Sequence, residues 1–440
     1  MRKSLSALRT KYYKLIITEF SKVTTAIFTV LSFFCYCFGG KFMHVAGIII
    51  EYDPLHTGHI HLMEETRRIL GEDTAIIGVM SGNFVQRGSV AIMDKRARAA
   101  AAIRGGVDLV VELPVPFAVA TAEVFARGGV SVLSGLGCVD TLSFGAECED
   151  LALLKAAAKA VTDPKVDELI KTELSGGVSY PTARAYAVRT VYGDETADVL
   201  EGPNNILAVE YLKALEQLGD PMAVEPMKRV GTGHDGLTAT DEFASASMLR
   251  IMLERGDERA FDFMPETTQV EFKRMVGVGR APVKVEESER AILSRLRMLT
   301  PEEIAKAPDV SEGLENRIYN AIQSATSLEE LYDIVKTKRY THSRIRRIVT
   351  ALYLGILPED RETVPYLRVL GFNDRGLEIL KAAKETATLP IVTKPAAIAG
   401  LDEKARHTFE LECRATNLYN LATPRILPCG TEYSDEIVML

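Results

Sequence analysis

Short apolar runs alternate with amphipathic segments from residue 45 onward. The apolar runs are rich in valine and isoleucine, as in strands buried on both faces of a sheet, and lie at 45–50, 74–80, 107–114 and 139–147. The segments between them have helical spacing and end in glycine, at 59–71, 94–106 and 122–137. Strands that alternate with helices over short connections predict an α/β fold with a doubly wound parallel sheet. Ligands bind such sheets beyond the carboxyl ends of the strands, where the strand order reverses.

The second half of the chain has a different pattern. Helical segments at 151–161 and 203–219 and a strand at 223–231 continue the first part. From about Arg255 the chain reads as amphipathic helices almost alone, at 301–307, 313–325, 327–338, 343–356 and 374–387. The pattern therefore predicts an α/β domain at 43–255, followed by a mostly helical C-terminal domain at 256–440.

The first forty residues do not fit this plan. Residues 1–22 are basic, and residues 23–40 are an uncharged apolar stretch close to the ~18 residues that a membrane span needs. Residues 1–42 are therefore an atypical extension, which is either an apolar anchor or a segment that is not translated. We favour a start at Met43, directly before the first strand, which gives a cytoplasmic protein without stable membrane association.

Composition excludes several classes of protein. At 440 residues the chain is long enough for two domains with cores of their own. A net charge of -8 argues against a protein coated in basic charge, although local basic patches are still possible. The six cysteines form no CxxC pair and no zinc spacing, so we expect reduced structural thiols and no bound metal.

Histidines are concentrated at one turn. The chain has seven, and His56, His59 and His61 fall together in the stretch HTGHIH, after the first predicted strand. His56 and His59 share one face of a helical turn, whereas His61 points away, which weakens a three-histidine metal site. Gly58 leaves room for a ligand against the backbone, and a helix N-terminus attracts anions. We interpret the turn as a phosphate site; histidines that merely cap and pack the helix are the alternative.

A second motif, FASASMLR, carries Ser245, Ser247 and Arg250. Hydroxyls at a helix start followed by an arginine suit the phosphates of a nucleotide, although alone the motif is an ordinary N-cap. Together, a strand followed by H-x-G-H and this later motif resemble the nucleotidylyltransferase and class I synthetase superfamily. The resemblance implies a Rossmann-like fold and attack on the α-phosphate of ATP.

Further segments make the resemblance more specific. GIIIEYDPLHTGH, VMSGNFVQRG, GVDLVVELP, SFGAE, GPNNILAVEY and KRYTHSRIRR together resemble the bacterial tRNA(Met) cytidine acetate ligases, from about Val45 to the middle of the helical region. The resemblance implies that acetate and ATP form acetyl-adenylate, with Mg2+ expected beside the ATP. The acetyl group would then pass to the exocyclic amine of the wobble cytidine of elongator tRNA(Met).

The same resemblance implies a set of site residues. His56 and His59 would act on the phosphates as the catalytic residues. The implied ATP-binding residues are Ile48, Ile49, Ile50, Glu51, Tyr52, Asp53, Pro54, Leu55, His56, Thr57, Gly58, His59, Ile60, His61, Gly145, Asn204, Arg229, Val230, Ser245, Ser247 and Arg250. Four residues after the second strand are weaker candidates for reaching the triphosphate, namely Gln86, Arg87, Lys95 and Arg98.

A basic segment at 336–347 is the candidate contact for RNA. It contains no acidic residue and has a tyrosine among its charges, which suits contact with backbone phosphates. The candidate residues are Lys336, Lys338, Arg339, Tyr340, Arg344, Arg346 and Arg347. The alternative is that this basic segment is an ordinary solvent-exposed helix face without a partner.

Three rival functions stay open at this point. A small-molecule nucleotidylyltransferase of the pantetheine-phosphate or mononucleotide type would share the phosphate site but need no RNA. A non-catalytic RNA-binding protein could be built on the same scaffold. A membrane-anchored protein would use residues 24–40.

Overall fold

The computed structural model describes residues 43–178, 180–229, 244–311, 313–337 and 340–440. Residues 45–440 form one compact unit, to which everything below refers. The predicted anchor lies outside the described residues. Within the described ranges, no helix is long and apolar enough to cross a membrane.

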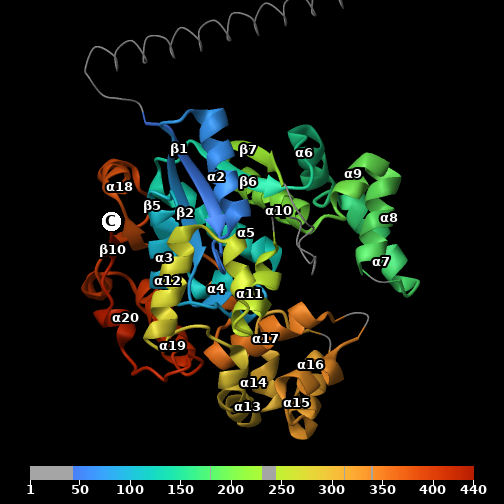
Figure 1. Ribbon diagram of the computed structural model, residues 1–440. Helices are drawn as coiled ribbons and strands as arrows, with labels where there is room; N and C mark the ends of the chain where they lie inside the picture. Colours follow the sequence, from blue (N-terminus) through green and yellow to red (C-terminus); the bar gives the residue numbers. More distant parts are fainter. Residues whose placement is uncertain (1–42, 179, 230–243, 312, 338–339) are drawn as a thin grey trace, which may run out of the picture. The chain divides into compact units, whose positions relative to one another are not determined.

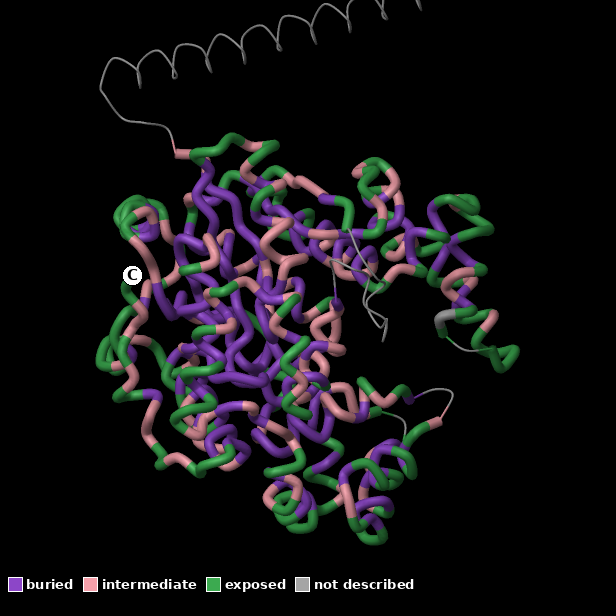
Figure 2. Tube along the Cα trace, in the orientation of Figure 1, coloured by how far each residue is buried: buried purple, intermediate pink, exposed green. Residues whose placement is uncertain are grey.

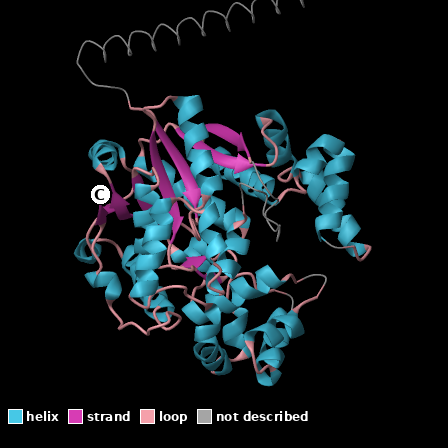
Figure 3. Ribbon diagram, viewed as in Figure 1, coloured by secondary structure: helices cyan, strands magenta, loops and turns pink. Residues whose placement is uncertain are grey.

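A parallel sheet forms the centre of the unit, as predicted (Figures 1 and 3). Five parallel strands lie side by side in the order β5 (Leu109–Leu113), β2 (Ala75–Ser81), β1 (Val45–Ile50), β6 (Thr141–Ala146) and β7 (Ala223–Lys228). The chain starts in the middle at β1, runs outward through β2 to β5, and then returns to β6 on the other side of β1. The strand order therefore reverses between β1 and β6, the position at which such folds bind ligands.

Both faces of the sheet are covered, which explains the continuous apolar strands (Figure 2). Ile48 and Ile50 of β1 point into a core shared with α2 (Thr57–Leu70) and α3 (Lys95–Arg104). The alternate residue Ile49 points to the opposite face, where its Cδ1 lies 2.6 Å from the position of a Cβ added to Gly129 of α5 (Ala122–Leu136). Gly129 is therefore required for close contact between α5 and the sheet.

Further helices surround this face. α10 (Pro203–Gln217) packs on α5 and β6, and α6 (Leu151–Ala160) packs on α10. The remaining helices of this half are α4 (Val115–Ala118), α7 (Pro164–Ser175), α8 (Tyr180–Tyr192) and α9 (Asp194–Val199). α11 (Ala246–Glu254) and α12 (Glu266–Gly277) follow, and α12 packs on α3.

The C-terminal region is mostly helical, as predicted. Besides α12, its helices are α13 (Glu289–Arg297), α14 (Pro301–Ala305), α15 (Leu314–Ser324), α16 (Leu328–Val335), α17 (His342–Leu354), α18 (Asp374–Thr386), α19 (Glu403–Tyr419) and α20 (Thr431–Ser434). Short 3-10 turns are η1 (Glu258–Phe263), η2 (Val285–Ser288), η3 (Pro358–Arg361) and η4 (Pro395–Gly400). The helices of residues 283–356 share one core with Phe84 and Val90, which belong to the hairpin of β3 (Phe84–Val85) and β4 (Ser89–Val90).

The prediction of helices almost alone after Arg255 is wrong for three short strands. β8 (Leu367–Phe372) pairs antiparallel with β5, while β9 (Ile391–Val392) and β10 (Val438–Met439) pair with β8. The apolar pattern of β8 is interrupted by Arg368, which is buried and ion-paired with Glu432 at 3.1 Å. A charged residue within an apolar run argues against a buried strand, and its partner Glu432 is 64 residues away, so the sequence pattern did not predict β8.

Candidate functional site

The two predicted histidines lie at the carboxyl end of β1, where α2 begins. His56 is the N-cap of α2, and its Nδ1 accepts a hydrogen bond from the backbone N–H of Gly58 at 3.1 Å. His59 returns the interaction, since its Nδ1 accepts from the backbone N–H of His56 at 3.3 Å. The two rings lie 3.8 Å apart between centroids, and the ring of Tyr52 lies 4.8 Å from that of His59. The spacing H-x-G-H is thus a reciprocal cap that fixes both rings.

This capping decides which ring nitrogens can donate. Because each Nδ1 accepts from a backbone N–H, a neutral ring carries its proton on Nε2. Burial, followed by the charges of Arg229 and Arg250, lowers the pKa of His56 to about 3. Burial and the neighbouring His56 lower the pKa of His59 well below its ordinary value. Both histidines are therefore neutral at pH 7, and each offers one Nε2–H donor to an anion.

A pocket with two connected cavities lies over these rings, in front of β1, β6 and β7. The cavities have volumes of 400 Å³ and 180 Å³ and share His56, His59, Leu62, Gly145, Arg229 and Ser245 in their linings. Most of the predicted nucleotide-binding residues line one or both, namely Ile48, Ile49, Ile50, Glu51, Tyr52, Asp53, His56, Gly58, His59, His61, Gly145, Asn204, Arg229, Ser245, Ser247 and Arg250. The fold therefore brings together segments that are up to about two hundred residues apart.

The start of α11 supplies one wall, as the second motif suggested. Ser245 is the N-cap of α11, and its Oγ accepts from the backbone N–H of Met248 at 3.2 Å. Arg250 donates to the backbone oxygen of Asp53 at 2.8 Å and to Oγ of Ser247 at 3.1 Å. Its guanidinium also lies 3.3 Å from the Asp53 carboxylate. These contacts tie the second motif to the turn before His56.

A second part of the lining is built on α10. The Asn204 side chain donates to Glu147 at 2.6 Å and accepts from Arg229 at 3.3 Å. Glu147 also accepts from the backbone N–H groups of Asn204 and Asn205, at the N-terminus of α10. An added Cβ at Gly145 would lie 3.0 Å from the Arg229 side chain. Asn204 and Gly145 therefore hold Arg229 in place over the pocket.

Some predicted residues lie elsewhere. Leu55 is buried in the core under α2, and Ile60 packs against that core. Pro54 and Thr57 are absent from the linings of both cavities, and Val230 lies outside the described residues. The side chains of Leu55 and Ile60 therefore support the fold beneath the turn.

Two of the weaker candidates are corrected by the structure. Arg98 is buried and donates to the backbone oxygens of Glu51, Ser81, Gly82 and Met93, so it joins the carboxyl ends of β1 and β2. Lys95 is buried between carboxylates, at 2.6 Å from Glu112 and 2.9 Å from Glu432. Neither side chain faces the pocket. Gln86 and Arg87 do line it.

Several other residues that line the pocket could not be recognised from the sequence. Phe125, Phe144, Leu207 and Tyr211 form an apolar wall of the smaller cavity, with 5.5 Å between the ring centroids of Phe144 and Tyr211. An apolar wall of this kind suits the flat face of a base. These residues read as ordinary core positions of helices and strands, so periodicity alone could not separate them. Glu147, by contrast, is the last residue of the SFGAE motif, directly after β6, and was a detectable signal although it acts through Asn204 and lines neither cavity.

The predicted RNA segment is only partly exposed. Lys336 is exposed, and Lys338 and Arg339 lie outside the described residues. Tyr340 is buried in the helical core with the Arg344 guanidinium 5.1 Å from its ring, which excludes it as a surface for base stacking. Arg344 donates to the backbone oxygen of Asp309 at 2.8 Å. Arg346 and Arg347 are half-buried on α17.

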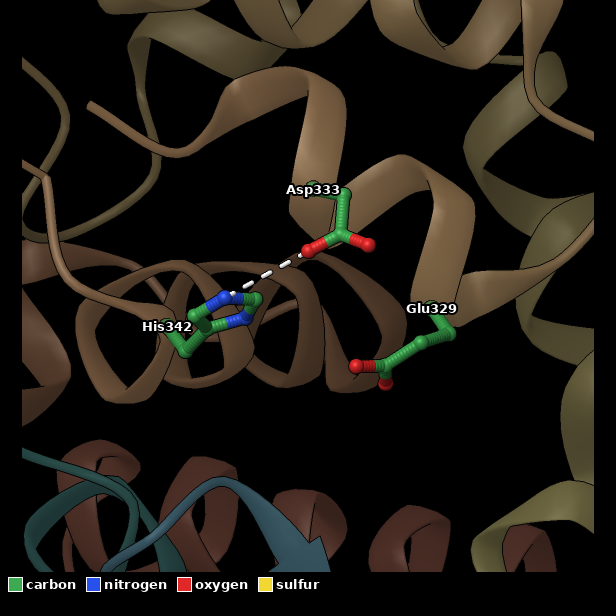
Figure 4. A group of neighbouring side chains, drawn as sticks. All are labelled: Glu329, Asp333 and His342. Carbon is green, nitrogen blue, oxygen red and sulfur yellow. Dashed lines mark ion pairs between the residues drawn. The ribbon is translucent and has the colours of Figure 1, made fainter.

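One group in the described part of the chain has the residue types of a metal site (Figure 4). Ligand atoms of Glu329, Asp333 and His342 all lie within 4.8 Å of one another, where α16 meets the start of α17. However, both carboxylates are exposed, His342 lies 3.5 Å from Asp333, and Arg346 lies 3.7 Å from Glu329. The side chains of the group thus contact each other and Arg346 between two helices, and we assign them no metal.

The fold and the histidine turn define a nucleotidyl transferase. Residues 43–431 match the HIGH Nucleotidyl Transferase family. The tRNA(Met) cytidine acetate ligase of Acetivibrio thermocellus is 36% identical over 416 residues, covering 90% of this chain and 100% of the relative. That of Caldanaerobacter subterraneus is 40% identical over 405 residues, with the same coverage.

Solved structures agree with these relatives. The crystal structure of Thermotoga maritima TmcAL in its apo form superposes with a TM-score of 0.86 at 33% identity, covering 90% of this chain and all of that one. TmcAL bound with alpha-thio ATP gives a TM-score of 0.84 at the same identity and coverage. The chain belongs to the tRNA(Met) cytidine acetate ligase family.

Proposed function

We propose that this chain is an ATP-dependent ligase that activates acetate as acetyl-adenylate and transfers the acetyl group to the wobble cytidine of elongator tRNA(Met). The observation that carries the proposal is the pair of neutral histidines over the pocket, at the point where the sheet order reverses. The names of the relatives and the bound ATP analogue of one of them supply the substrates. Because tRNA is cytoplasmic, we expect the activity there.

The first half-reaction follows from the charges of the pocket. A carboxylate oxygen of acetate attacks the α-phosphorus of ATP, the bond to the β-phosphate breaks, and pyrophosphate leaves. The Nε2–H groups of His56 and His59 donate to the phosphate oxygens, on which negative charge develops. Arg229 and Arg250 both line the smaller cavity and supply the positive charge that the neutral histidines lack. The flat apolar wall around Tyr211 would take the adenine.

Magnesium ion is expected to accompany ATP, since Mg2+ in such sites is bound mainly by phosphates and by one or two carboxylates. Asp53 fits this role: it lines the smaller cavity, and its buried Oδ2 accepts no hydrogen bond from the described residues, with the Arg250 guanidinium 3.3 Å away. When bound, the ion would neutralise phosphate charge.

In the second half-reaction the cytidine amine attacks the acetyl carbon, the bond to the adenylate oxygen breaks, and AMP leaves as the amine loses a proton. We propose that residues 43–255 carry the adenylation and that the helices after residue 256 hold the anticodon arm. Lys336, directly after α16, is exposed, and Arg346 of α17 is half-buried beside Glu329; we expect these two described basic residues to contact the RNA phosphates.

The test uses the purified protein with ATP, magnesium, labelled acetate and a set of purified tRNAs. We expect label in elongator tRNA(Met) alone, and none with the His59→Ala variant. If label appears in no RNA but the protein adenylylates phosphopantetheine or a mononucleotide, it is a small-molecule transferase. If the protein does not bind ATP, we conclude that it is a non-catalytic RNA-binding protein.

A further inference from the structure

A carboxylate outside the nucleotide pocket caps α10. The N-cap position of this helix is Gly202, which has no side chain to accept from the first N–H groups. The carboxylate of Glu147, directly after β6, accepts from the backbone N–H of Asn204 at 3.2 Å and from that of Asn205 at 2.7 Å. An added Cβ at Gly202 would lie 2.6 Å from Oε2 of Glu147. The glycine therefore leaves the space that Glu147 occupies.

Hydrogen bonds join the same two segments in the other direction as well. The side-chain Oδ1 of Asn205 accepts from the backbone N–H of Cys148 at 2.8 Å. Asn204 and Asn205 are both buried, although each has a polar side chain. The end of β6 and the start of α10 are thus fixed to each other, and this pairing is formed without any residue of the histidine turn.

Glu147 also decides which way the amide of Asn204 faces. The Asn204 Nδ2 donates to Glu147 at 2.6 Å, and its Oδ1 accepts from Nη1 of Arg229 at 3.3 Å. A carboxylate can only accept and a guanidinium can only donate, so one orientation of the amide satisfies both neighbours. The reverse orientation would set two donors against each other, which is costly for a buried amide. Glu147 therefore keeps the amide oxygen towards Arg229.

Arg229 needs such a contact to stay in one position. The residue is exposed, and a long side chain in solvent samples many rotamers. It lies over Gly145, where an added Cβ would be 3.0 Å from its Cγ. Arg229 lines both cavities together with His56 and His59. Ordering a free arginine when the nucleotide binds weakens binding, whereas a hydrogen bond to Asn204 orders the guanidinium beforehand.

We propose that Glu147 is a positioning residue for the reaction with ATP: it orients the Asn204 amide, which in turn holds the Arg229 guanidinium towards the phosphates. Glu147 lines neither cavity, so it acts only through these two side chains. This role rests on the proposed function and adds to it a residue that lies outside the pocket.

The test is a double-mutant cycle of Glu147→Gln and Arg229→Gln in the full chain, with acetate-dependent exchange of pyrophosphate into ATP as the readout. Glutamine has the size of glutamate but replaces one acceptor oxygen by a donor. We expect Glu147→Gln to lower the exchange rate up to about tenfold, as for one side chain that must be ordered on binding. Arg229→Gln removes the charge and should lower the rate about a hundredfold. The double variant should match Arg229→Gln alone, because Glu147 has no route to the nucleotide without Arg229.

Asp150→Asn is the matched control. Asp150 caps the neighbouring helix α6 by accepting from the backbone N–H groups of Ala152 and Leu153, at 2.8 and 3.2 Å. It lines neither cavity, and α6 packs on α10. The control therefore changes a carboxylate cap into an amide cap in the same part of the fold. We expect similar small shifts of the urea midpoint in Asp150→Asn and Glu147→Gln, and an unchanged exchange rate in Asp150→Asn.

Three results would overturn the role of Glu147. The first is a fall of less than about twofold in Glu147→Gln, which is too small for an arginine that has lost its fixed position. The second is a double variant in which the two effects multiply, since Glu147 would then act independently of Arg229. The third is an equal fall in Asp150→Asn, which would show a general effect of helix caps. Absence of exchange in the unchanged protein refutes the proposed function instead. The role of Glu147 is then decided by the Kd for ATP, measured by calorimetry, where the same cycle should be non-additive and independent effects overturn it.

Discussion

The role of His59 can be tested apart from its role as a cap. His59 does two things in the structure: its Nδ1 accepts from the backbone N–H of His56, and its Nε2 is free to donate toward the pocket side. In asparagine, the side-chain oxygen sits at the same number of bonds from Cβ as Nδ1 does in histidine. His59→Asn can therefore keep the cap while it removes the Nε2–H donor. His59→Ala removes both.

The two losses differ in size. Removal of an N-terminal capping interaction costs about 0.5–2 kcal/mol of folding free energy. Removal of one pre-positioned donor to a developing negative charge lowers kcat by about 10²–10³-fold, which corresponds to about 2.7–4 kcal/mol. We therefore expect both variants to lose adenylation to a similar extent, and only His59→Ala to lose stability.

Acetate-dependent pyrophosphate exchange reports adenylation, and equilibrium unfolding in urea reports stability. The reasoning is refuted if His59→Asn retains more than about a third of the exchange rate, because no phosphate contact of the expected strength would then exist. A loss of activity that tracks the loss of stability across both variants would show a structural role only.

Three further predictions concern the same pocket. The pKa of His56 is lowered to about 3 from an ordinary 6.5, so between these pH values the unfolded chain binds a proton that the folded chain does not. The free energy of unfolding should therefore fall as the pH drops from 6.5 towards 3. Above pH 6.5 it should not depend on this group. Urea unfolding should show a slope of up to about 1.4 kcal/mol per pH unit that His56→Asn removes. Arg250→Lys should raise the Kd for ATP, measured by calorimetry, about tenfold, because a single ammonium group cannot bind Asp53 and Ser247 at the same time. As a control, Arg255→Lys at the other end of α11 should leave the Kd unchanged. Gly145→Ala should weaken ATP binding several-fold with Tm nearly unchanged, because its Cβ displaces the flexible Arg229 side chain and no backbone; an unaltered Kd would contradict the role given to Arg229.

The parts of the fold that depend on local pattern were predictable. β1, β2, β5, β6 and β7 and the helices between them follow from apolar runs, helical spacing and glycine stops. The histidine turn could be predicted as well, because cap, glycine and helix start are all local. β8 could not, since the buried Arg368 is compensated by Glu432, 64 residues further along the chain.

For the site, side-chain direction was the information that the sequence lacked. In the segment from Ile48 to His61, residues 48–53 all line the smaller cavity, whereas Leu55 faces the core under α2 and does not reach the cavity. Arg98 lies in a basic helix that reads like a solvated surface, yet it is among the largest fully buried side chains. Its donors satisfy the backbone oxygens that the ends of β1 and β2 leave open. Such a role depends on which strand ends lie next to each other in the fold, and the sequence pattern does not show that.

The connection between the sheet and the C-terminal helices has a consequence for catalysis. Phe84 and Val90 of the hairpin and Val115 and Val119 near α4 lie in the same core as the helices of residues 283–356. The hairpin also carries Gln86 and Arg87 to the nucleotide pocket. A shared core resists sliding, because a close-packed interior cannot deform without loss of contacts. An RNA bound on α16 and α17, as proposed above, would therefore be held at a fixed distance from the adenylate. Attack of the cytidine amine on the acetyl carbon needs the reacting atoms ~3–3.5 Å apart, and rigid support for both substrates favours that alignment.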